Sequence, residues 1–108
     1  MQKKENEILV DVVIRYCVHE QYGNFDKAVV ALKKRLLYFD DNAVRNLLKI
    51  HIDIFEYSRN FVLKAMKKSH VKSTTLDKVI KEISERFQCD NEIISSYLNF
   101  CHYYYILK

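Results

Sequence analysis

Proline is absent from this chain of 108 residues, and glycine occurs only once, at Gly23. Tight β-turns and hairpins depend on these two residues, so their scarcity argues against a sheet-rich fold. Residues that favour helices, such as leucine, lysine and glutamate, are frequent instead. The composition therefore predicts an all-α protein.

Long apolar runs are also missing, since none approaches the roughly 18 residues that a membrane-spanning helix needs. The first residues, MQKKENEILVDVVIRYCV, are basic and then apolar, as in a signal peptide. However, Glu5, Glu7, Asp11 and Arg15 interrupt the apolar part, and no small-residue cleavage site follows. We expect an amphipathic helix in a cytoplasmic protein without a membrane segment.

Cysteine is scarce and odd in number, since the chain contains only Cys17, Cys89 and Cys101. An odd count argues against a disulfide framework. Cys17-x-His19 and Cys101-His102 lack the CxxC or HxxxH spacing that brings two ligands to one metal ion. We expect buried, unreactive thiols, no metal site and no cofactor.

The longest helical pattern runs from Asp41 to Ser69. Side chains at i, i+3/i+4 and i+7 spacing form one stripe: Val44, Leu48, His51, Phe55, Ser58, Val62 and Ala65, with Leu47, Ile54, Phe61 and Met66 beside it. This pattern predicts one long central helix over about 42–69. Ser58 and Asn60 are weak helix formers, so a kink near Ser58 is the alternative to a continuous helix.

Breaks near residues 23, 40–42, 70–73 and 88–90 leave four further helices, over about 4–22, 25–39, 75–87 and 91–106. Gly23 suits a left-handed helix end, and Asn24 and Asp90 can cap the helices that follow them. Inward positions are Val29, Leu32, Leu36 and Phe39, then Leu76, Val79 or Ile80, Ile83 and Phe87, then Ile94, Tyr97 or Leu98, Cys101 and Tyr105. We predict a compact bundle of about five helices, a single domain over residues 1–108.

The net charge of +4 is concentrated in the middle of the chain. Residues 26–72 contain eleven basic and five acidic side chains, a net charge of +6. The cations that we assign to a partner-binding surface are Lys33, Lys34, Arg35, Lys64, Lys67 and Lys68. Such a group favours a partner with an acidic face, and a solvated surface is the alternative.

Aromatic side chains are numerous near the C-terminus, where Tyr103, Tyr104 and Tyr105 follow one another. Consecutive residues on a helix point in different directions, so these three rings cannot all be buried on one side. Tyrosine is enriched in interfaces because it combines a large area with a polar tip. We expect Tyr103 and Tyr104 to anchor either a different partner or a second copy of the chain in a homodimer.

Residues 76–98 resemble a helix-turn-helix, in which the helices over about 75–87 and 91–106 flank a short turn. This stretch is also similar to the C-terminal helices of bacterial replication-initiator DNA-binding domains. The resemblance implies that Asn91, Ser95 and Ser96 contact base edges, although Gln88 stands where the turn usually has glycine. Two packed antiparallel helices are the alternative.

The stretch from Arg45 to His51 resembles the Arg-polar-x(n)-His signature of HEPN-type helical ribonucleases. The resemblance implies that Arg45 stabilises charge on a scissile phosphate, that His51 exchanges protons, and that Asn46 is the polar neighbour. However, residues six apart on a regular helix do not share a face, and His51 lies on the predicted core stripe. A buried packing role for His51 is therefore the alternative.

The sequence shows no other arrangement of catalytic side chains, neither a glycine-rich phosphate loop nor a nucleophile elbow. We therefore expect a small cytoplasmic binding protein rather than an enzyme, most simply a protein inhibitor, antitoxin or immunity-type module. A DNA-binding regulator and a HEPN-like ribonuclease are the two alternatives.

Overall fold

The computed structural model describes residues 3–65 and 73–107. These residues form five α-helices: α1 (Lys3–Cys17), α2 (Phe25–Arg35), α3 (Asp41–Ala65), α4 (Ser73–Phe87) and α5 (Asn91–Cys101). A π-helical segment, His102–Leu107, continues α5, and the described part of the chain contains no strand. The predictions of an all-α chain and of about five helices are confirmed.

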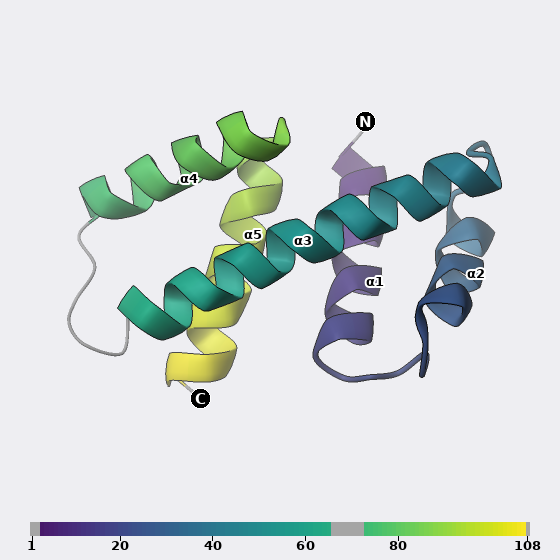
Figure 1. Cartoon of the computed structure of the whole chain (residues 1–108), viewed down its shortest axis with the longest axis horizontal. Helices are drawn as coiled ribbons and strands as arrows, with labels where there is room; N and C mark the ends of the chain where they lie inside the picture. Colours follow the sequence, from purple (N-terminus) through teal and green to yellow (C-terminus); the bar gives the residue numbers. More distant parts are fainter. Residues whose placement is uncertain (1–2, 66–72, 108) are drawn as a thin grey trace. The chain divides into compact units, whose positions relative to one another are not determined.

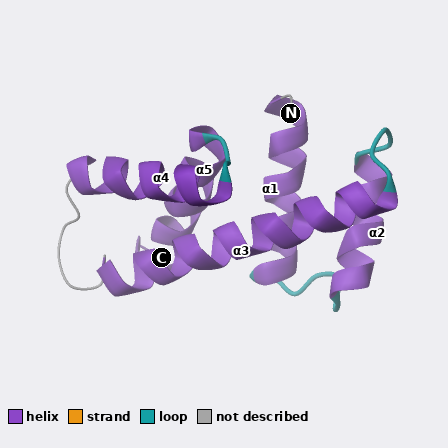
Figure 2. Ribbon diagram, turned by 45° about the horizontal axis from the view of Figure 1, so that its top comes forward, coloured by secondary structure: helices purple, strands orange, loops and turns teal. Residues whose placement is uncertain are grey.

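The helices group into two compact units, Met1–Ile52 and Asp53–Lys108, which share helix α3 (Figure 1). In the first unit, α1 and α2 lie side by side and the first half of α3 crosses them (Figures 1 and 2). The second unit consists of the second half of α3, α4, α5 and the π-helical segment. The prediction of one domain over residues 1–108 stays a prediction.

Helix α3 confirms the core stripe that the sequence predicts. Val44, Leu48, Phe55 and Val62 are fully buried, and so is the polar residue Ser58. The Ser58 hydroxyl donates to the carbonyl of Ile54 at 2.9 Å, and the helix continues without a break through this position. The predicted end of the helix, near residue 69, lies outside the described residues. No helix in the described ranges is both long and apolar enough to cross a membrane.

Helix α1 ends at Cys17, five residues before the predicted end at Tyr22. Glu20 takes a left-handed conformation, with φ of 51°, and the Gln21 amide donates to the carbonyl of Arg15 at 3.0 Å. The Arg15 guanidinium in turn donates to the side chain of Gln21 at 2.9 Å. Gly23 is left-handed as expected, but it lies in the loop rather than at the helix end.

Helix α2 ends at Arg35, so the predicted end at Phe39 is wrong. Its start is as expected, because the side chain of Asn24 accepts from the amide of Lys27 at 2.9 Å. At the other end, Leu36 leaves helical geometry, with φ of −115° and ψ of 68°. The Lys33 ammonium donates to the carbonyl of Phe39 and fixes the turn that follows.

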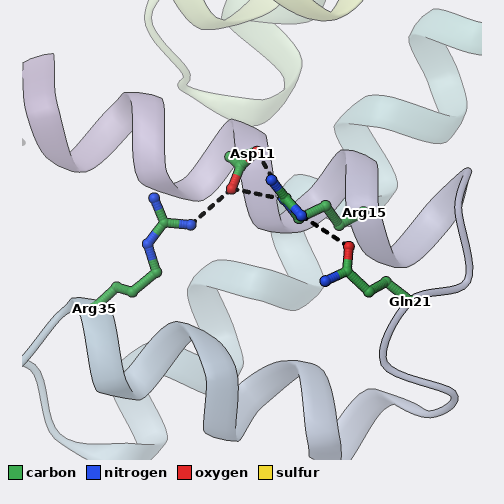
Figure 3. Close-up of polar contacts among 4 residues, drawn as sticks. All are labelled: Asp11, Arg15, Gln21 and Arg35. Carbon is green, nitrogen blue, oxygen red and sulfur yellow. Dashed lines mark hydrogen bonds and ion pairs between the residues drawn. The ribbon is translucent and has the colours of Figure 1, made fainter.

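An ion-pair cluster joins α1 to α2 in the first unit (Figure 3). The Asp11 carboxylate accepts from Arg15 on its own helix at 3.0 Å and from Arg35 of α2 at 2.7 Å. Burial of the Asp11 carboxyl raises its pKa, but the hydrogen bonds and charges of Arg35 and Arg15 outweigh this effect. The pKa of Asp11 therefore lies below its usual value of 3.8.

Replacing Asp11 by asparagine is expected to lower the free energy of unfolding by about 0.5–1 kcal/mol at neutral pH, a small value because solvent screens this cluster. The native carboxyl has the lower pKa, so its contribution is fully present above pH 3.8 and is lost as the pH falls through the native pKa. Urea unfolding of both proteins over a series of pH values measures this. Asp26→Asn is the control, because Asp26 also pairs with an arginine, Arg45, but its side chain is 76% exposed. Equal losses in the two variants would contradict the prediction.

The second half of α3 is held to α4 by a polar and aromatic contact. The Tyr57 hydroxyl donates to the carboxylate of Glu82 at 2.7 Å, and the Tyr57 ring meets Phe87 edge-on, with centroids 6.1 Å apart. The Arg86 guanidinium lies over both rings. The hydrogen bond to Glu82 raises the pKa of Tyr57, with burial as the second cause. This contact fixes α4 in the second unit.

Candidate functional site

The cations of the predicted binding surface divide between the two units. Lys33, Lys34 and Arg35 form the last turn of α2, whereas Lys64 lies in the last turn of α3. Two of these cations make contacts within the first unit. Arg35 pairs with Asp11, and Lys33 donates to the carbonyl of Phe39. Lys34 and Lys64 are exposed. Lys67 and Lys68 lie outside the described residues.

The predicted aromatic surface at the C-terminus lies on the π-helical segment. Tyr103 is 63% exposed, and Leu107 is 66% exposed. They are four residues apart, about one turn of this wide helix, so both belong to one side of the segment. Tyr104 and Tyr105 are half-buried. We call Tyr103 and Leu107, together with Lys64, the C-terminal surface.

A series of rings in contact with one another supports this surface from the core. Phe55 is fully buried and meets Tyr97 edge-on, with ring centroids 5.6 Å apart. Phe55 also contacts Phe100 at 6.3 Å, and Phe100 stacks on Tyr104 at 5.4 Å with the ring planes 16° apart. Tyr104 meets Tyr105 at 5.0 Å. The backbone that carries Tyr103 is therefore anchored through its neighbours to the centre of the second unit.

Positive charge accompanies the aromatic surface. The described C-terminal end lies beside the end of α3 that carries Lys64 (Figures 1 and 2). Arg59, five residues earlier on α3, places its guanidinium 5.5 Å from the centre of the Phe55 ring. This cation therefore packs on the same series of rings. An exposed aromatic residue beside cations is a suitable contact for an acidic protein surface.

The α4–α5 pair matches the predicted helix-turn-helix in its turn. Gln88 is left-handed, with φ of 52°, at the position where glycine usually stands in this motif. The Ser84 hydroxyl donates to the carbonyl of Cys89 at 3.0 Å and ties α4 to the turn. Helix α5 then crosses the direction of α4 instead of running back along it (Figure 1). The antiparallel alternative is therefore wrong for this pair.

The electrostatics of this pair are less suited to DNA. An open groove of about 590 Å³ between α4 and α5 is lined by the carboxylates of Asp77 and Glu85, with Lys81 between them along α4. Residues 76–98 contain five acidic and three basic side chains, a net charge of −2. Neutralisation of phosphates normally supplies much of the affinity for DNA. Asn91 and Ser96 are exposed on α5 and Ser95 is half-buried, although the Ser96 hydroxyl donates to the carbonyl of Glu92.

None of the three cysteines forms a disulfide, and they differ in burial. Cys101 is buried as expected, whereas Cys17 and Cys89 are only half-buried. Burial raises the pKa of the Cys89 thiol to about 11, and the charge of Asp90 adds to this shift. Cys89 therefore remains a thiol at neutral pH and is a poor nucleophile there. No group of three or more potential metal ligands gathers within residues 3–65 and 73–107.

Arg45 and His51 lie in different environments on α3. His51 is 5% exposed, which confirms the core position that the helix stripe predicts. Arg45 is exposed, and its guanidinium pairs with the carboxylate of Asp26 on α2 at 2.8 Å. His51 would have to leave its packed position to reach a phosphate. Arg45 is thus paired with Asp26 while His51 is packed in the core, and the ribonuclease hypothesis stays a prediction.

One exposed apolar feature is missing from the sequence prediction. The loop between α2 and α3 presents Leu37, which is 73% exposed, and Tyr38, which is fully exposed at 101%. The sequence prediction missed this loop because it extended the helix to residue 39. The sequence did indicate the exposure of these two side chains. Leu37 and Tyr38 do not belong to the apolar stripe of Val29, Leu32 and Leu36, so both would be exposed even if the helix continued.

Comparison with known proteins gives no relative from which a function can be transferred. No protein-family model matches this chain, and neither the curated proteins nor the solved structures contain a match.

Proposed function

We propose that this protein binds an acidic partner protein through its C-terminal surface and thereby inhibits that partner, as an antitoxin or an immunity protein does. The observation that carries the proposal is the exposure of Tyr103 and Leu107 on a segment that contacting aromatic rings anchor to the core. A large aromatic side chain held in place loses little conformational freedom on binding, which favours affinity. An inhibitor of this kind needs no reacting group of its own.

The proposed charge of the partner rests on the lysines at the end of α3 and in the sequence that follows it. Lys64 is exposed at the end of α3, and Lys67 and Lys68 follow it in the sequence. Opposite charges across an interface speed association and discourage wrong partners. We therefore propose a partner whose binding face contains aspartate and glutamate around an apolar centre that receives Tyr103.

Capture from a native lysate with the full chain as bait, followed by mass spectrometry, identifies the partner. Tyr103→Ala is then expected to weaken binding about thirtyfold, since a central tyrosine contributes about 2 kcal/mol at many interfaces. Lys64→Glu is expected to slow association and to make binding less sensitive to salt. Calorimetry gives the affinity, and stopped-flow mixing gives the association rate.

Tyr38→Ala is the matched control, because it removes an even more exposed tyrosine, from the first unit. We expect it to leave the affinity for the partner unchanged when the protein is dilute. A partner that binds the Tyr103→Ala variant as tightly as the original chain would contradict the proposed site.

The turn geometry of α4 and α5 favours one second candidate, a DNA-binding protein. Its supporting observation is the left-handed Gln88 in a short turn between two crossing helices. In this candidate Asn91 and Ser95 of α5 would contact base edges. In the same capture experiment, duplex DNA that is retained at low salt and released by Asn91→Ala, but not by Tyr103→Ala, would favour this function.

A further inference from the structure

A small hollow lies in the first unit, between the first turns of α1 and the loop that follows α2. Its volume is about 260 Å³, and its wall includes Ile8 of α1 and Leu37 and Tyr38 of the loop. Small-molecule sites usually measure about 300–1,000 Å³, so this hollow suits an inserted protein side chain better than a cofactor.

The residues beside the hollow project strongly into solvent. Tyr38 is fully exposed and Leu37 is 73% exposed. The loop is nevertheless fixed, since the amide of Phe39 donates to the carbonyl of Leu36 at 3.2 Å and Lys33 bonds the carbonyl of Phe39. A protruding pair of apolar side chains therefore forms one edge of a hollow that could receive such a side chain from another molecule.

The rim of the hollow contains both signs of charge. Lys4 and Glu5 are adjacent in the first turn of α1 and both line the hollow. Arg35 also lines it, but its charge is paired with that of Asp11. A surface that combines a projection with a hollow, and a cation with an anion, is complementary to itself. A two-fold axis would bring each feature of one copy to its counterpart on the other.

We infer that the occupant of this hollow is a second copy of the chain. In the resulting two-fold contact, Tyr38 of each copy enters the hollow of the other, and Lys4 of each copy faces Glu5 of the other. The contact is small, because the few apolar side chains of each loop bury far less than the roughly 1,600 Å² of a standard interface. The dimer is therefore weak and depends on concentration. This inference is independent of the C-terminal surface.

Sedimentation velocity on the full chain, at concentrations from about 1 µM to 1 mM, covers the range of weak affinities. The mass is expected to rise from 13.0 kDa towards twice that value. Tyr38→Ala is expected to weaken the association at least about tenfold. Because Tyr38 is fully exposed, this variant keeps its fold, which circular dichroism checks. Tyr103→Ala is the matched control and leaves the association unchanged.

A charge exchange tests the two-fold geometry. Lys4→Glu and Glu5→Lys each place like charges across the axis, and each is expected to weaken its own dimer about tenfold. An equimolar mixture of the two variants pairs opposite charges again and should associate about as well as the original chain. A mass that stays at 13.0 kDa throughout, an unchanged Tyr38→Ala variant, or a mixture that remains monomeric would each overturn the inference.

Discussion

Replacing Tyr97 by alanine is expected to lower the free energy of unfolding by about 3–5 kcal/mol, the usual effect of removing a buried aromatic ring. Tyr97 is fully buried in α5, and its ring meets Phe55 of α3 edge-on at 5.6 Å. Alanine would leave a cavity between these two helices and remove one of the ring contacts of Phe55. Domains of this size have a total stability of about 5–15 kcal/mol, so the loss is a large part of it.

Urea unfolding followed by circular dichroism measures this change. The control is Tyr103→Ala, the same chemical substitution six residues later on a side chain that is 63% exposed. It is expected to change stability by no more than about 0.5 kcal/mol. Similar losses in the two variants would mean that Tyr97 and Tyr103 do not differ in burial as described.

The second large effect is expected at Leu32, whose replacement by alanine should cost about 2–5 kcal/mol. Leu32 is fully buried in α2, where it belongs to the stripe that also contains Val29 and Leu36. Truncation removes apolar contacts in the first unit and leaves a cavity that surrounding side chains fill only in part. Unfolding by urea gives the change, and hydrogen exchange in α2 shows whether the loss is local.

Leu37→Ala is the matched control, since Leu37 lies five residues further along and is 73% exposed. Its effect on stability in dilute protein is expected to stay within about 0.5 kcal/mol. This comparison also tests where α2 ends. A loss at Leu37 close to that at Leu32 would place Leu37 in a packed environment, contrary to the turn described after Leu36.

Burial within helices could be predicted from the sequence because spacing alone determines it. The stripe on α3 placed His51 and Ser58 in the core although both are polar, and both are buried. The same spacing identified Ile94 and Cys101 on α5, which are fully buried. Caps with a short polar side chain were also recognisable, as Asn24 shows by accepting from the amide of Lys27.

Helix ends could not be predicted where no glycine or proline marks them. Leu36 continues the apolar stripe of α2, so periodicity extended that helix past its true end. The end depends instead on the turn at Leu36, on the bond from Lys33 to the carbonyl of Phe39, and on Asp40, which accepts from the amide of Ala43 at 2.8 Å. A correctly predicted cap position does not guarantee the capping bond. Asp90 is at the predicted N-cap of α5, but its side chain makes no capping hydrogen bond.

The candidate site was predicted only in part. The excess of tyrosine indicated exposed rings at the C-terminus, and Tyr103 is exposed. The spacing of four residues brings Phe100 and Tyr104 to one side of a helix, but it could not show that their rings stack with the planes 16° apart. The sequence identified Lys33 and Arg35 as cations. It could not show that Lys33 binds the carbonyl of Phe39 and that Arg35 pairs with Asp11 within the first unit.

The boundary between the two units falls inside α3, between Ile52 and Asp53, and this limits how the chain can be divided. Of the 25 residues of α3, 12 lie before the boundary and 13 after it. Isolated helices shorter than about 12–15 residues are only marginally stable in water. A fragment that ends at Ile52 or begins at Asp53 would therefore lose its last or first helix. Tags and inserted domains belong in the exposed loop before α2, where they leave the helix common to both units intact.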